Sequence, residues 1–136
     1  MMPSLDTILD NFTFLEDWED RYRYLIELGR SLEPLTDDEH NEGNRVEGCA
    51  SQVWLVVSEE ERQGMVYMRF RADSDAHLVR GLLTLVLSLY DNHTREEIKE
   101  IDAEDFFKKL NLSGHLSQQR SNGLRSVVEK IRSTAS

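Results

Sequence analysis

The sequence predicts an α+β fold, because the spacing of its apolar residues changes twice along the chain. Apolar residues recur at helical spacing in residues 5–33, follow a β-type pattern in residues 52–71, and return to helical spacing from residue 76 onward. Helices on both sides of a short β region are typical of the α+β class. No repeat or linker divides the 136 residues, so we expect one domain over residues 1–136.

Two helices are expected before the β region. Ser4 precedes a helical stripe that begins at Leu5, and serine is a favoured N-cap residue. A second helix is expected over residues 17–33, because Pro34 follows the end of its apolar stripe. Residues 36–48 are polar and acidic, which predicts a loop.

The β region predicts a hairpin. Residues 52–57 are mostly apolar and β-prone, as in a strand covered on both faces. Residues 58–64 are polar and are expected to form the turn. Residues 65–71 alternate, which predicts a second, half-exposed strand with three apolar residues on one face: Val66, Met68 and Phe70.

The remaining chain predicts helices. Residues 73–75 (Asp-Ser-Asp) offer N-cap side chains for a helix over residues 76–90, whose apolar residues on nearly every face indicate burial. Thr94 with Glu97 matches a capping box, and Asp102 is expected to cap another helix. A last helix carries apolar residues at i, i+3, i+4 and i+7: Leu124, Val127, Val128 and Ile131.

Composition excludes several functions. A net charge of −10 argues against nucleic acid and against an anionic membrane surface as partners. Residues 1–20 hold six acidic side chains and no Lys or Arg, so no targeting segment is expected and the default compartment is a reducing cytoplasm. Residues 1–48 carry a net charge of −9, which indicates either a solvated acidic face or a surface complementary to a basic partner.

Cys49 is the single cysteine, so it cannot form an internal disulfide or a multi-cysteine metal site. It is either a small core residue or a reagent. It stands at a junction between loop and strand, next to Gly48, and small neighbours allow another molecule to approach the sulfur. The charged residues near it, mainly Glu47 and Arg45, are not expected to lower the pKa of its thiol. This argues against a hydrolase nucleophile, which needs a paired base.

Other candidate residues carry weak signals by themselves. The four histidines are His40, His77, His93 and His115; none has the i, i+4 zinc spacing, and surface or capping roles are favoured over a mixed site with Cys49. Asp73 and Asp75 could be paired carboxylates, although capping is favoured. Arg120 is interpreted as a solvated arginine.

The ordered motifs resemble the SufE family, the sulfur-acceptor partners of PLP-dependent cysteine desulfurases in iron–sulfur cluster assembly. They span nearly the whole chain: WEDRY at 18–22, LIELG at 25–29, VEGCASQVW at 46–54, DSDA at 73–76, RGLL at 80–83, HLS at 115–117 and RSNGL at 120–124. The resemblance implies a SufE/IscU-like α+β fold, with a small antiparallel sheet of about three strands packed against helices.

The resemblance also implies a site. Cys49 falls on the sulfur-accepting cysteine, which would carry sulfur as a persulfide, and Arg120 falls on an arginine near that cysteine. Asp73 and Asp75 fall near the cysteine loop, where Gly48 and Ser51 are its small neighbours. Such a loop would shield its persulfide in an apolar pocket, with Gly43 and Gly48 as hinge candidates. We expect no metal and no cofactor in this chain.

The implied partners are a SufS-like or CsdA-like cysteine desulfurase, whose own cofactor is PLP, and a downstream cluster-assembly scaffold. The motifs do not choose between the two desulfurases, and we expect a monomer or weak homodimer. The sequence leaves three hypotheses: a non-PLP accessory protein that relays sulfur, a regulatory module that activates the desulfurase without carrying sulfur, and a cysteine hydrolase.

Overall fold

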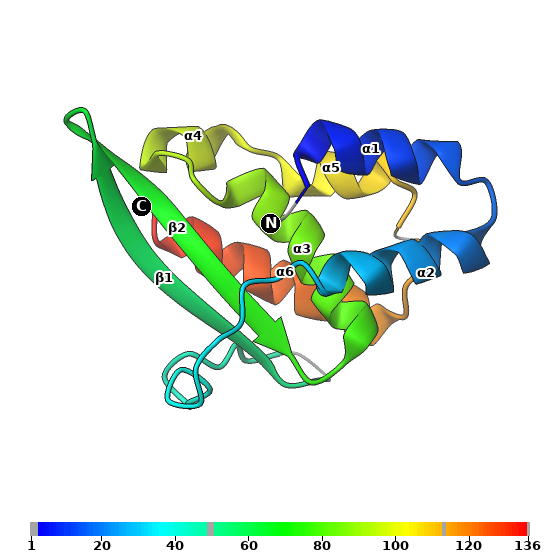
Figure 1. The fold of residues 1–136 in the computed structure, drawn as a ribbon, viewed down its shortest axis with the longest axis horizontal. Helices are drawn as coiled ribbons and strands as arrows, with labels where there is room; N and C mark the ends of the chain where they lie inside the picture. Colours follow the sequence, from blue (N-terminus) through cyan, green and yellow to red (C-terminus); the bar gives the residue numbers. More distant parts are fainter. Residues whose placement is uncertain (1–2, 49–50, 113, 136) are drawn as a thin grey trace.

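The computed structural model describes residues 3–48, 51–112 and 114–135. Its six helices lie to one side of a long, twisted β-hairpin (Figure 1). The elements follow in the order α1 Leu5–Phe14, α2 Trp18–Gly29, β1 Val53–Arg62, β2 Met65–Ser74, α3 His77–Tyr90, α4 Arg95–Glu100, α5 Ala103–Lys109 and α6 Gln118–Ser133. The predicted α+β class is confirmed.

The helix starts show why the local predictions succeeded. The Ser4 hydroxyl accepts a hydrogen bond from the Thr7 amide at the start of α1, and Thr94 and Glu97 form the full capping box of α4. Asp102 caps α5 through the Asp105 amide. Each cap satisfies a backbone donor that the helix itself leaves unpaired.

The second helix is shorter than expected. It ends at Gly29 rather than near Glu33, because residues 30–32 form tighter turns that bond back to Glu27, Leu28 and Gly29. The sequence pattern predicted a longer helix because Leu32 continues the apolar spacing. In the structure Leu32 is buried, but it lies in the turns that follow the helix.

The corner between α1 and α2 depends on Arg21. Its Nε donates to the backbone oxygens of Phe12 and Leu15, and its guanidinium lies about 5 Å from the rings of Phe12 and Trp18. These contacts satisfy carbonyls at the end of α1, where the helix has no partner for them.

We therefore expect Arg21→Ala to lower the free energy of unfolding by about 2 kcal/mol. Arg21→Lys keeps the charge but lacks the planar guanidinium, so it should recover only part of the loss. Urea denaturation measures both values. Equal stability of Arg21→Ala and the wild type would contradict this role.

The hairpin is longer than the sequence indicated. Residues 58–62, expected in the turn, continue β1 and pair antiparallel with β2 as far as Arg62 opposite Met65. The turn is only Gln63 and Gly64, both with positive φ, as in the two-residue turns that match strand twist. Polar composition misled the prediction, since this end of the hairpin extends past the core and is largely solvated on both faces.

The sheet has two strands in the described part of the chain, where about three were expected. The segment before Cys49 comes beside β1 but forms only one bridge, between Arg45 and Trp54. The two edges of the hairpin are covered unequally. Residues 91–93 bond to Met68 and Phe70 along the β2 edge, whereas beyond Leu55 no described backbone group bonds to the β1 edge.

The buried helix α3 is the centre of the fold, as predicted. Nine of its 14 residues are buried, and it packs against α2, β2, α6 and α1. Its crossing with α2 is very close, because an added Cβ on Gly81 would lie 2.0 Å from the Leu25 carbonyl oxygen. Gly81 therefore sets the distance between the two helices.

The helix α3 begins without the predicted aspartate cap. Its N-cap is Ala76, which makes no side-chain cap hydrogen bond. Asp73 and Asp75 are instead engaged with other segments, so the capping expectation was wrong.

Candidate functional site

The site begins with the segment before Cys49, which folds back onto β1. The Val46 amide donates to the Val53 carbonyl, and the Leu55 amide donates to the Asn44 carbonyl, both at 2.8 Å. These two bonds close the span of residues 47–52 at its base. Cys49 and Ala50 belong to this span but lie outside the described residues.

Both sides of the span are anchored. On the far side, the Gln52 amide donates to Asp75 Oδ1 at 3.1 Å, and the Asp75 amide donates to the Gln52 carbonyl. On the near side, Gly48 has φ of +89° and lies against α6, where an added Cβ would be 2.6 Å from Ser126 Oγ. This φ lies in the left-handed region, which glycine adopts without the strain of a Cβ.

Gly48 gives a direct test of this geometry. We expect Gly48→Ala to lower the free energy of unfolding by about 1–2 kcal/mol, since an L-residue with positive φ is strained. The overlap with the flexible Ser126 side chain adds to this cost.

A double-mutant cycle separates the two contributions. Ser126→Ala removes the overlapping hydroxyl, and the single variant accounts for the loss of its hydrogen bond to the Asn122 carbonyl, so the double variant should recover only part of the stability. Full recovery would show that the backbone angle at Gly48 costs nothing.

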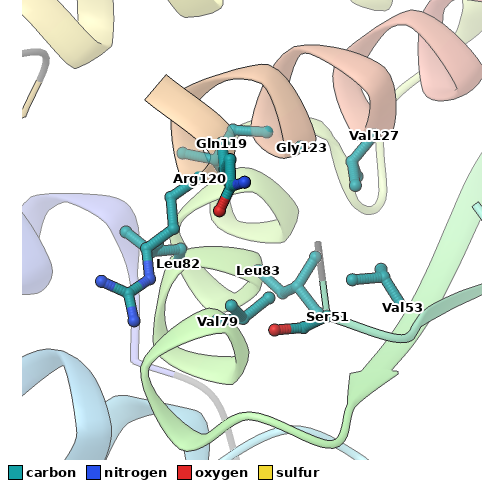
Figure 2. A pocket seen from close by; sticks show the side chains of 10 residues that line it. Ser51, Val53, Val79, Leu82, Leu83, Gln119, Arg120, Gly123 and Val127 are labelled. Atoms are coloured by element: carbon teal, nitrogen blue, oxygen red, sulfur yellow. The ribbon is translucent and has the colours of Figure 1, made fainter. Parts of the chain in front are cut away.

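A small apolar cavity of about 30 Å³ lies next to the span. Its walls come from the start of β1, one face of α3 and the first turns of α6, as Figure 2 shows. The lining residues are Ser51, Val53, Val79, Leu82, Leu83, Gln119, Arg120, Gly123, Leu124 and Val127. The cavity has room for about one small atom or water molecule and offers it mainly apolar contacts.

Arg120 reaches this cavity from the first turn of α6, where Ser117 caps the helix by accepting from the Arg120 amide. Its side chain lies on the Leu82 side, across the cavity from Ser51 in the view of Figure 2. Arg120 is exposed, and no carboxylate in the described part of the chain forms an ion pair with it. The structure thus brings Arg120 to the same cavity as Ser51, which its sequence context alone did not indicate.

Asp73 lies on the other side of the hairpin. One carboxylate oxygen accepts from His40 at 2.9 Å, and the other lies 3.2 Å from Arg80 Nε. Asp73 is therefore joined to the segment that precedes the span, whereas Asp75 is joined to the span itself. The two aspartates do not form a pair with a shared ligand.

Sequence reasoning missed three residues near the site. Ser126 lies next to Gly48, and nothing in its surroundings in the sequence distinguishes it. His40 and Arg80 contact Asp73, and they are separated from it by 33 and 7 positions. His40 was interpreted as a surface residue of an acidic loop, whereas its side chain is only 27% exposed.

Side chains of the types that can bind metals are dispersed over the described residues. Within 3–48, 51–112 and 114–135, no three side chains of the His, Cys, Asp or Glu type come together as metal ligands. His115 stacks on Trp18 with ring centroids 3.7 Å apart. The His93 ring contacts the Asp91 carbonyl.

The fold and the site define a small α+β protein in which a short span is closed at its base by two backbone bonds, and its Ser51 lines an apolar cavity between β1, α3 and α6. A family model described as "SufE: Fe-S metabolism associated domain" matches residues 6–135. The chain belongs to the SufE family. It therefore acts in iron–sulfur metabolism, in a role related to sulfur transfer, as an accessory protein associated with cysteine desulfurases.

Individual relatives agree with this assignment. An uncharacterized SufE-like protein of Rhizobium etli is 52% identical over 134 residues, which cover 98% of this chain and 90% of the relative. Another from Rhizobium meliloti is 48% identical and covers 98% and 96%. A solution structure of a hypothetical protein from Thermus thermophilus superposes with a TM-score of 0.71 at 21% identity, covering 99% and 96%, which supports the fold.

The family assignment agrees with the resemblance drawn from the motifs. One further observation concerns membranes: none of the helices in the described residues is long and apolar enough to cross a bilayer.

Proposed function

We propose that this protein relays sulfur, by accepting it from a PLP-dependent cysteine desulfurase onto Cys49 and passing it to a cluster-assembly scaffold. The observation that carries the proposal is the closed span 47–52, whose Ser51 lines an apolar cavity. The span contains one cysteine, and a sulfur carrier needs only one thiol.

The chemistry is thiol exchange. The Cys49 thiolate attacks the outer sulfur of the desulfurase persulfide, a new S–S bond forms on Cys49, and the desulfurase cysteine leaves as a thiolate. One S–S bond forms and one breaks, so no external oxidant or reductant is required. The acceptor needs an accessible thiolate but no fixed base and no cofactor of its own.

Two features of the described residues support a carrier role. The walls of the cavity are mainly apolar, so a bound sulfur would be protected from water and soluble thiols. Arg120 supplies a cation at the same cavity, which would favour a thiolate or a persulfide anion. Gly48 and Asp75, which anchor the span, would act as positioning residues.

The partner surface is expected to be basic. Residues 1–48 carry a net charge of −9 and lead directly to the span, so this region would speed encounter with a positively charged desulfurase surface. Reversing charges there should slow association most at low salt, where screening is weakest. We propose a cytoplasmic location, because thiol carriers require a reducing compartment.

Intact-mass spectrometry tests the relay. The wild-type protein is incubated with L-cysteine and a desulfurase of the SufS or CsdA type, and then its mass is measured without reductant. We expect the gain of one or more sulfur atoms, removed by dithiothreitol and mapped to Cys49 after alkylation and digestion. A regulatory module would gain none, and that result would overturn the proposal.

A further inference from the structure

The segment that leads into the span 47–52 is fastened to the outer face of the hairpin by charged side chains. Glu39 forms a two-point ion pair with Arg71 of β2, and His40 contacts both Asp73 of β2 and Trp54 of β1. In Figure 1 this segment follows α2 and crosses the hairpin before it reaches the span. These two side chains therefore add to the backbone bonds of Val46 and Leu55 in holding the segment against the strands.

His40 is unusual because both of its ring nitrogens face acceptors. Nδ1 lies 2.8 Å from the Thr36 carbonyl oxygen, and Nε2 lies 2.9 Å from Asp73 Oδ2. A carbonyl and a carboxylate cannot donate, and a neutral imidazole has only one N–H. The Asp73 carboxylate also accepts a hydrogen bond from the Ser74 amide and forms an ion pair with Arg80, so it acts as an acceptor in this contact.

We propose that His40 is an imidazolium that clips residues 36–46 to the hairpin, and that its deprotonation loosens this segment. Both ring hydrogen bonds are satisfied only when both nitrogens carry protons. Loss of one proton leaves two acceptors in contact at either Thr36 or Asp73. The clip is therefore closed at lower pH and weakened at higher pH.

The groups around His40 favour its protonated form. The hydrogen bond to Asp73 raises the pKa of His40 above 6.5, and the Thr36 carbonyl and the charge of Asp37 act in the same direction, against partial desolvation. The charged groups near it on the packed elements are Asp37 and Glu39 on its own segment, Arg71 and Asp73 on β2, and Arg80 on α3 behind Asp73. From β1 it meets the Trp54 ring, with centroids 4.7 Å apart.

The pH window follows from the direction of this shift. A raised pKa in the folded protein means that the stabilisation is complete below about 6.5 and is lost as pH rises through the folded pKa. The neighbouring ion pair does not titrate in this range, since the hydrogen bond from Arg71 lowers the pKa of Glu39 to about 2. His40 is thus the group expected to confer pH dependence on the segment.

Nitrogen-15 NMR of the imidazole rings tests the charge directly in the wild-type chain. We expect both ring nitrogens of His40 to show the protonated signature at pH 6.5, with the exposed His77 ring as the internal reference in the same spectra. Asp73→Asn should lower the pKa of His40. A neutral His40 ring at pH 6.5 in the wild-type protein would overturn the proposal.

Hydrogen exchange tests the clip. The Val46 and Leu55 amides form the two bonds that join the segment to β1. We expect their protection factors, relative to the Leu85 amide in α3, to fall roughly tenfold as His40 loses its proton. In His40→Gln this pH dependence should vanish, and in the matched control His77→Gln it should persist. Protection that is independent of pH in the wild type would contradict the clip.

Neither experiment requires a desulfurase or sulfur transfer. If the clip is correct, we also expect sulfur acceptance by Cys49 to change across the same pH range. That single consequence rests on the proposed function, so failure of the relay would leave the titration and exchange results intact.

Discussion

Cys49→Ser is expected to abolish sulfur loading and at least most of the stimulation of the desulfurase. Serine is nearly the same size but cannot attack a persulfide at neutral pH or hold sulfur. In a turnover assay with L-cysteine, the wild type should accelerate sulfide or alanine production in the presence of reductant. The variant should return the rate to that of the desulfurase alone.

The control for this variant is the fold. Circular dichroism and thermal unfolding of Cys49→Ser should match the wild type, because a hydroxyl in place of a thiol in a short span changes little of the core. Full stimulation by a folded Cys49→Ser variant would contradict the relay and favour the regulatory module. If Cys49→Ser lost stimulation but the wild type carried no detectable sulfur, that result would also contradict the relay and favour the regulatory module.

Gly81→Ala is expected to cause the largest loss of stability among the substitutions considered. Its Cβ would lie 2.0 Å from the Leu25 carbonyl oxygen, so α2 and α3 must separate. Such overpacking costs about 3 kcal/mol or more, against a gain of about 1 kcal/mol from replacing glycine within a helix. We expect the free energy of unfolding to fall by about 2–3 kcal/mol and the Tm to fall by roughly 10 °C.

Two other glycines provide graded controls. A Cβ on Gly29 would lie 2.9 Å from the Gly81 amide nitrogen and from Arg80 Cβ, so Gly29→Ala should cost less than Gly81→Ala. A Cβ on exposed Gly43 would meet only Asn41 Oδ1, at 3.2 Å, so Gly43→Ala should be nearly neutral. Denaturant unfolding would contradict the close-crossing argument if the three variants were equally stable.

The sequence predicted local structure well where a short-range rule applies. The caps at Ser4, Thr94 and Asp102 each depend on a residue three positions away, and all three are confirmed. The burial of α3 was readable from its apolar residues on nearly every face. The hairpin beyond residue 57 was not readable, because its strands are solvated and their polar sequence resembles a turn.

The candidate site was less readable, because its contacts are distant in sequence. Asp73 and Asp75 looked like caps for the helix that follows them. In the structure they bond to His40 and Gln52, which lie 33 and 23 positions earlier. The motif resemblance directed attention to the span around Cys49. It gave no sign of the Gly48–Ser126 contact or of the two acceptors around His40.

The unequal covering of the hairpin edges bears on whether a strand of another molecule can pair with the sheet. The β2 edge is closed by residues 91–93, while the far half of β1 presents backbone groups, unpaired within the described chain, that could template a strand from another molecule. That exposed length carries three consecutive glutamates, Glu59 to Glu61. Glu59 and Glu60 form ion pairs with Arg95 and Arg69, so a second copy joining antiparallel there would have to bury these charged side chains, which disfavours pairing at this edge.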